Sequence, residues 1–258
     1  MTESAEGSTP NSAPEPGAFS RLAGVLFSPG KTFASIGRKP GYDWLLPVAI
    51  LIVMTVIGVS LINPKLDTDS AMKQTMRRIE ERRPMTDAQR EQTQKMLEKQ
   101  YGFAKSGAIR FIAPIIVLIP IFFVPALYFG ASKAMGAAAK YGTILAGYAF
   151  CQVPQLIKGV IGLIVALPRD SIDLNEVEHI VRSNVGSFLD AETTSKPLMA
   201  LMNQVDLFEI WGVVIGSIML ARVTKLSKNA ATITVVSIWV VYVIFKVGGA
   251  ALGAAFGG

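Results

Sequence analysis

Two long apolar runs in the last quarter of the chain constrain its fold more than any other feature. They cover Leu207–Ala221 and Ala230–Phe245, and an eight-residue polar link joins them. Each run approaches the roughly 20 apolar residues that a helix needs to cross about 30 Å of hydrocarbon. The link contains three cations and no acid, which is typical of a cytoplasmic turn. The pair is therefore predicted to form a transmembrane helical hairpin.

Three further apolar runs repeat this pattern, so the sequence predicts an all-α, polytopic membrane bundle. The five expected spans cover about residues 44–62, 111–131, 143–167, 207–222 and 230–250. Apolar residues make up 51% of the 258 residues and are concentrated in these runs, whereas a soluble domain would disperse them. One cysteine, Cys151, and one histidine, His179, offer neither a disulfide framework nor a metal cluster. We attribute the net charge of +6 to loop cations and expect no nucleic-acid partner and no cofactor.

The N-terminal region is predicted to contain a tail and two short helices before the first span. Residues 1–18 are rich in Ser, Pro, Gly and Glu, which predicts a disordered tail, and residues 19–258 form the expected membrane domain. Residues 19–38 favour two amphipathic helices suited to the membrane interface, the second beginning at Ser28-Pro29. The triplet Gly30-Lys31-Thr32 lacks the earlier glycine of a phosphate-binding loop, since Val25 stands there.

Two long polar loops, residues 63–110 and 168–206, separate the spans. Within the first, residues 68–83 and 86–105 favour helix, and Thr86 with Gln89 forms a capping box. Residues 65–107 contain ten basic and seven acidic side chains, which is typical of a solvated helical hairpin or of a docking arm for a protein or lipid headgroups. The second loop has seven acids and three basic residues, with a short helix expected over residues 174–189.

Five polar residues in or beside the spans are the candidate functional residues. Gln152, Gln155 and Lys158 lie at three-residue spacing on one predicted stripe of span three. They could hydrogen-bond between helices or line a substrate or conduction site. Asp206 and Glu209 begin span four. They could be helix-start carboxylates, counter-ions of Lys158 or a proton-handling pair.

Small residues and one lysine mark the last two spans. Gly212 with Gly216, and Gly249 with Gly253, form GxxxG patterns, which predict close helix packing within the chain or between copies of it. Lys246 interrupts the end of span five and is expected to extend to the far interface.

The charge distribution predicts a cytoplasmic N-terminus. In that orientation the basic segments 21–39, 133–140 and 222–228 lie inside, and the acidic loop before span four lies outside. The ten cations of residues 65–107 would then lie outside, which favours the inverse orientation. The short loops carry more weight, because charges far from span ends are weaker determinants.

Three stretches resemble the Yip1 domain family of integral membrane proteins. They read LFSPGKTF at 26–33, YAFCQVPQL at 148–156 and DLFEIW at 206–211, and the resemblance covers about residues 19–247. It implies five spans, a cytosolic N-terminus and, through the prokaryotic members, a bacterial cytoplasmic membrane. Eukaryotic members act in vesicle traffic and contact small prenylated GTPases through their cytosolic N-terminal part. Here only about 43 residues precede the first span, most of low complexity, so we do not carry that partnership over.

Two hypotheses about function follow. The first is a non-enzymatic scaffold or organiser of membrane components with a trafficking-like role, because no Ser/His/Asp or metal grouping suggests catalysis and the family supplies no catalytic residues. Its partners would be the lipid bilayer, other membrane proteins or further copies of the chain. The alternative is a small transporter or channel that uses the polar stripe of span three and the acids of span four.

Overall fold

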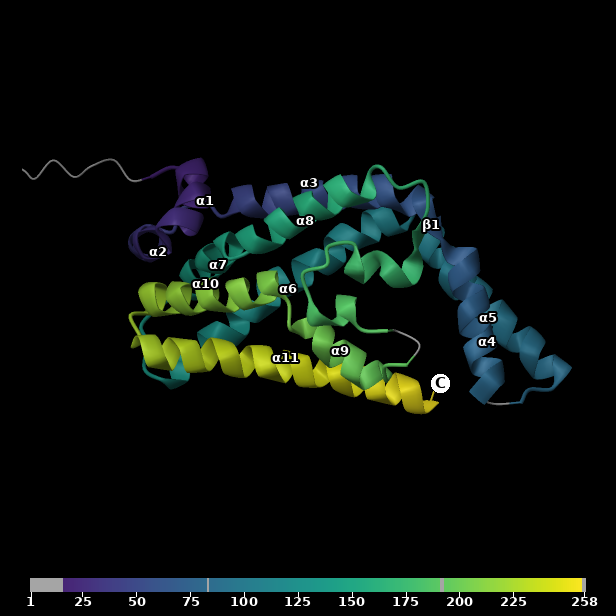
Figure 1. Cartoon of the computed structure of the whole chain (residues 1–258). Coiled ribbons are helices and arrows are strands. Elements are labelled where there is room, and N and C mark those ends of the chain that lie inside the picture. Colours follow the sequence, from purple (N-terminus) through teal and green to yellow (C-terminus); the bar gives the residue numbers. More distant parts are fainter. Residues whose placement is uncertain (1–15, 83, 191–192, 257–258) are drawn as a thin grey trace, which may run out of the picture.

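The computed structural model describes residues 16–82, 84–190 and 193–256, which form a bundle of long helices (Figure 1). The predicted tail, residues 1–18, lies almost wholly outside the described residues. Five helical segments are long and apolar enough to cross a membrane: Leu45–Lys65, Ile109–Ala134, Tyr141–Ala166, Leu207–Thr224 and Lys228–Ala254. The predicted all-α, five-span bundle is therefore confirmed.

The spans alternate in direction, so the bundle has two different ends (Figure 1). At one end, the N-terminal end, lie the short loops and the two predicted N-terminal helices, α1 (Ala18–Phe27) and α2 (Pro29–Arg38). The opposite end, here called the arm end, holds both long polar segments and the C-terminus. The spanning helices are α3 (Leu45–Ile62), α6 (Ile109–Ala134), α7 (Tyr141–Phe150) with α8 (Val153–Ala166), α10 (Leu207–Thr224) and α11 (Lys228–Phe256).

The main core lies where α2, α7 and α10 meet near the N-terminal end. Phe33 and Ile36 of α2 are fully buried, so this short helix packs into the bundle as well as lying at its end. The α7 and α10 helices approach closely at Gly147. A Cβ atom there would lie 2.8 Å from the Met219 side chain, which explains why the position carries no side chain.

The third span is broken, whereas a continuous helix was expected over residues 141–167. Helix α7 ends at Phe150 and α8 begins at Val153, with Cys151 and Gln152 between them. Pro154 explains the break, because it has no N–H group to donate to the carbonyl of Phe150 four residues earlier.

The first polar segment forms the predicted helical hairpin, which projects from the bundle as an arm (Figure 1). A short 3-10 helix (Asn63–Lys65) leads into α4 (Thr68–Arg82), and α5 (Asp87–Lys105) returns antiparallel to it. The Thr86–Gln89 capping box is confirmed, with both reciprocal hydrogen bonds present. The two arm helices pack through Leu97, which is 3% exposed, so the arm has a small core of its own.

The second polar segment differs from the prediction of one helix over residues 174–189. It holds two 3-10 helices, Leu174–His179 and Val185–Phe188, and a further helix, α9 (Lys196–Gln204). The local reason is that the Asn184 side chain accepts hydrogen bonds from the backbone N–H and the hydroxyl of Ser187, which competes with a continuous helix. A two-residue parallel ladder of β1 (Leu66–Asp67) with β2 (Ile172–Asp173) joins this segment to the base of the arm.

Candidate functional site

Asp206 is the centre of a buried polar cluster at the start of α10. Asp206 is fully buried, and its carboxylate caps the helix by accepting hydrogen bonds from the backbone N–H groups of Phe208 (2.8 Å) and Glu209 (3.2 Å). The extended backbone before α10 bridges to residue 184, with the Leu207 N–H donating to the Ser183 carbonyl at 3.0 Å. Two segments that are distant in sequence, the start of α10 and the loop at residues 183–184, therefore fix the position of this carboxylate.

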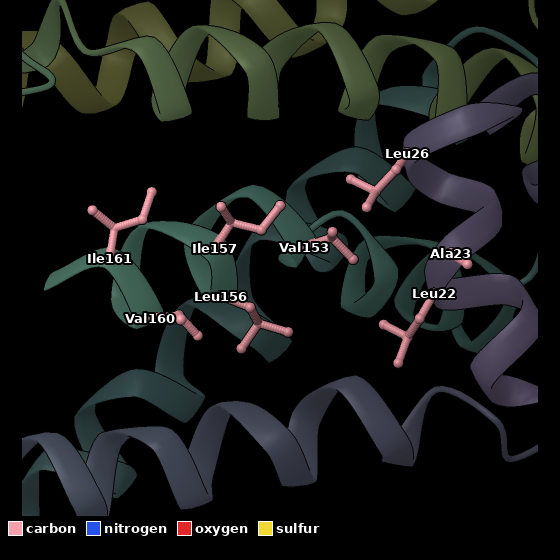
Figure 2. A pocket seen from close by; sticks show the side chains of 8 residues that line it. All are labelled: Leu22, Ala23, Leu26, Val153, Leu156, Ile157, Val160 and Ile161. Atoms are coloured by element: carbon pink, nitrogen blue, oxygen red, sulfur yellow. The ribbon is translucent and has the colours of Figure 1, made fainter. Parts of the chain in front are cut away.

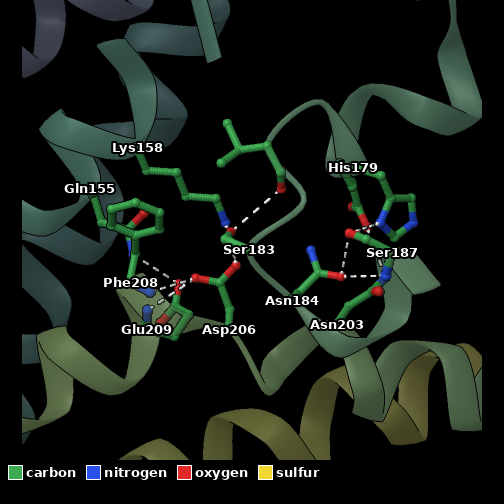
Figure 3. A network of polar contacts seen from close by, with 12 residues as sticks. Gln155, Lys158, His179, Ser183, Asn184, Ser187, Asn203, Asp206, Phe208 and Glu209 are labelled. Atoms are coloured by element: carbon green, nitrogen blue, oxygen red, sulfur yellow. Dashed lines mark hydrogen bonds and ion pairs between the residues drawn. The ribbon is translucent and has the colours of Figure 1, made fainter. Parts of the chain in front are cut away.

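Lysine and glutamine side chains from α8 reach the two acids of α10 (Figure 3). Lys158 Nζ lies 2.9 Å from Asp206 Oδ2, and Gln155 Nε2 donates to Glu209 Oε1 at 3.0 Å. The Ser183 hydroxyl also donates to Asp206. The ion pair is well shielded, because the side chains of Lys158 and Asp206 are 26% and 1% exposed. The structure thus brings together Gln155, Lys158, Asp206 and Glu209, four of the five candidate residues.

The Asp206 carboxylate is held in its ionised form. Burial by itself raises the pKa of Asp206, but the hydrogen bonds from Ser183 and Lys158 and the nearby ammonium charge outweigh it. The net pKa therefore lies below the ordinary value of 3.8. A carboxylate that stays ionised and accepts several donors is suited to structural pairing rather than to accepting a proton.

The predicted stripe of three polar residues is only partly assembled. Gln152 lies at the break between α7 and α8, and its amide donates to the Tyr148 carbonyl at 3.5 Å instead of reaching the acids. The prediction assumed one continuous helix. The two-residue break changes the angular relation between Gln152 and the pair Gln155 and Lys158.

Chain geometry shows which elements surround the start of α10. Helix α10 has 18 residues and α11 has 29, so at about 1.5 Å per residue α11 extends about 16 Å beyond its partner. Helix α9 occupies the space beside the second half of α11 (Figure 1). Buried backbone outside helices requires other protein groups to satisfy its polar atoms. The bonds to Asp206, together with the bridge at residue 184, supply that satisfaction.

The four predicted packing glycines occupy different environments. A Cβ atom at Gly216 would lie 3.5 Å from the Val235 side chain of α11, so this glycine faces a neighbouring helix of the same chain. At Gly212, Gly249 and Gly253 no described atom lies within 4 Å of such a Cβ. Packing against a second copy at those three positions remains a prediction.

Sequence reasoning missed two sets of polar contacts. Arg21, 2% exposed, pairs with Asp43 at 3.0 Å and donates to the Lys39 carbonyl, which fixes α1 to the entry of the first span. No sequence signal identified it. The second set is the Asn184 turn, and the spacing of Asn184 and Ser187 is a helix-capping pattern that could have revealed it.

Two cavities lie outside this cluster. An apolar groove of about 340 Å³ runs between α1 and α8 (Figure 2), and a polar cavity of about 670 Å³ lies at the arm end. Only apolar side chains line the groove: Leu22, Ala23, Leu26, Val153, Leu156, Ile157, Val160 and Ile161. None of the four clustered polar residues lines either cavity. Among the described residues no group of three or more His, Cys, Asp or Glu side chains could hold a metal ion.

The fold and the internal polar cluster define a polytopic α-helical membrane protein. The sequence matches the Yip1 domain over residues 23–249, nearly the whole chain, and the protein belongs to that family. Neither the curated proteins nor the solved structures contain a match. The suspected family is therefore confirmed.

Proposed function

We propose that this protein is a non-enzymatic membrane scaffold that organises other membrane components. The observation that carries the proposal is the closed polar cluster: Lys158 pairs with Asp206 and Gln155 bonds to Glu209, and neither cavity is lined by these residues. Polar side chains that satisfy one another hold helices together and leave no group directed at a substrate.

The α4–α5 arm is the surface best suited to a partner. It projects from the bundle and exposes two large apolar side chains of α5, Met96 at 59% and Phe103 at 51%. Charged residues surround them, which is the pattern of a polar rim around apolar anchors. We propose that another membrane protein docks on this face of α5.

The same proposal includes the location of the chain. Short basic loops at the N-terminal end support a cytoplasmic N-terminus and, with the prokaryotic resemblance, a bacterial cytoplasmic membrane. The arm then lies on the opposite side. Labelling of single cysteines at residues 103 and 140 with a membrane-impermeant reagent tests this orientation. Labelling of residue 140 but not 103 in intact cells would contradict it.

The scaffold proposal is tested by photocrosslinking in native membranes, followed by affinity purification and mass spectrometry. A photoreactive amino acid replaces Met96 or Phe103 in the arm. The control replaces Phe123 of α6, which is equally exposed at 59% but lies in a spanning helix. We expect a discrete, reproducible protein adduct from the arm positions alone. Recovery of the chain without any adduct would count against the proposal.

A transporter is the second candidate, favoured by the break in the third span and by the start of α10 beside it. Discontinuous helices are common at transport sites. This candidate predicts that Lys158→Ala and Glu209→Ala alter proton flux into proteoliposomes containing a pH-sensitive dye, while Lys140→Ala does not. If the variants lower only thermal stability, the cluster is structural.

A further inference from the structure

The polar cavity at the arm end has a cationic wall. Its volume is about 670 Å³, within the range of ligand pockets, and α4, residues 169–189 with Thr194, α9 and α11 supply the lining. Five basic side chains contribute to it: Arg78, Arg169, Arg182, Lys196 and Lys246. Segment 168–206 is acidic overall, yet all three of its basic residues line this cavity. The cations are therefore gathered here against the charge of the surrounding chain.

The acidic side chains of the cavity are already engaged. Glu176 pairs with Arg169 at 3.7 Å, Glu178 accepts from the Asn203 amide, and Asp173 accepts from Gln74. Each of these contacts lies within the lining itself. Asn203 and Gln74 are neutral donors, so Asp173 and Glu178 keep their charge, and the five cations of the lining exceed its three acids by two.

Arg78, Arg182, Lys196 and Lys246 form no ion pair within 4 Å in the part of the chain that the structure describes, although Lys246 interacts electrostatically with Glu209 of α10. The four cations converge from α4, the loop, α9 and α11. Like charges gathered in one cavity repel one another and attract anions. An anion placed among them would relieve that repulsion.

Lys246 distinguishes this cavity from an ordinary charged surface. It is the only charged residue of α11 after Lys228, and it lies within the candidate span Lys228–Ala254. Ionisable side chains in spans are costly and usually mark binding sites or pathways. Beside it, Ile244 and Phe245 are 63% and 75% exposed, so a charged cavity directly adjoins a surface suited to acyl chains.

We propose that this cavity binds a phosphate-bearing anion, supplied by the headgroup of an anionic phospholipid in the leaflet at the arm end. The phosphate lies among the excess cations of the cavity wall, and the acyl chains lie along the exposed apolar side chains of α11. This inference goes beyond the proposed scaffold role and does not depend on it. Binding of the same phosphate group from a soluble molecule is the alternative source that the experiment separates.

The test is native mass spectrometry of the delipidated full chain in detergent. The probes are dioctanoyl phosphatidylglycerol, dioctanoyl phosphatidylcholine and glycerol 3-phosphate. The cavity variant is Arg182→Gln with Lys246→Gln. The control, Lys133→Gln with Lys140→Gln, removes the same charge at the N-terminal end. The altered cavity side chains are exposed, so both variants should fold, and their unliganded thermal midpoints check this.

We expect the cavity variant to raise the Kd for phosphatidylglycerol about tenfold or more, because each cation near a phosphate contributes about 1 kcal/mol. The control variant should change the Kd less than twofold, and phosphatidylcholine should bind more weakly. Equal binding of glycerol 3-phosphate, with the same loss in the cavity variant, would support the anion site and assign it to a soluble source. Equal loss in both variants, or no preference for phosphatidylglycerol, would overturn the proposal.

Discussion

The Lys158–Asp206 ion pair provides the sharpest test of how the bundle is held together. The two charged atoms lie 2.9 Å apart, and the carboxylate side chain is 1% exposed. Removing one member of such a pair leaves an unpaired buried charge and costs about 3–5 kcal/mol. Lys158→Ala should fall at the lower end of that range, because Asp206 keeps its three other hydrogen-bond donors.

Asp206→Ala should cost more, because it also removes the cap of α10. A lost N-cap costs about 1 kcal/mol, so the total should reach about 4–6 kcal/mol of unfolding free energy. In the double variant the ion pair is lost only once. The sum of the two single-variant losses of unfolding free energy should therefore exceed the loss in the double variant by about 3 kcal/mol.

Unfolding by sodium dodecyl sulfate in mixed micelles, followed by circular dichroism, measures these free energies. The matched control is the exposed Glu91–Lys95 pair, whose atoms lie 2.6 Å apart but whose side chains are 69% and 68% exposed. The coupling energy of this exposed pair should be only about 0.3–0.5 kcal/mol. The reasoning holds that burial makes the Lys158–Asp206 pair strongly stabilising. It would be refuted if the free-energy losses of the two single variants were additive, or if the two ion pairs had equal coupling energies.

Further predictions concern other parts of the structure. Because the pKa of Asp206 lies below its ordinary value of 3.8, its contribution is present above that pH and is lost as the pH falls through the folded-state pKa. The thermal midpoint of the wild type should thus approach that of Asp206→Asn only in acid. Gly216→Leu should lower stability by about 1–3 kcal/mol through overpacking, and Gly212→Leu should leave the isolated chain unchanged. If Gly212→Leu abolishes self-association in analytical ultracentrifugation, a second copy of the chain packs at Gly212. Thr86→Ala should cost about 1 kcal/mol and speed proteolysis of the arm. Arg21→Gln should cost about 1–2 kcal/mol in chemical unfolding, because it removes the hydrogen bond to the Lys39 carbonyl and the ion pair with Asp43, which is 37% exposed.

Part of the candidate site could be predicted because helical periodicity places residues on faces. The three-residue spacing of Gln155 and Lys158 put both side chains on one face of α8, and they do reach α10. The role of Asp206 as both helix cap and counter-ion combines two of its predicted alternatives. Its remaining contacts, with the Ser183 hydroxyl and with the backbone bridge at residue 184, involve a loop whose path no periodicity describes.

The sequence by itself determined the five spans and the helical arm. Those features depend on apolar run length, helix-starting residues and polar loop composition, which act locally along the chain. The packing of α9 beside α11 and the meeting of cations from four segments in one cavity arise only in the tertiary structure. These features depend on how distant segments satisfy one another's backbone and charges, and that information is distributed across the whole chain rather than contained in any one stretch of it.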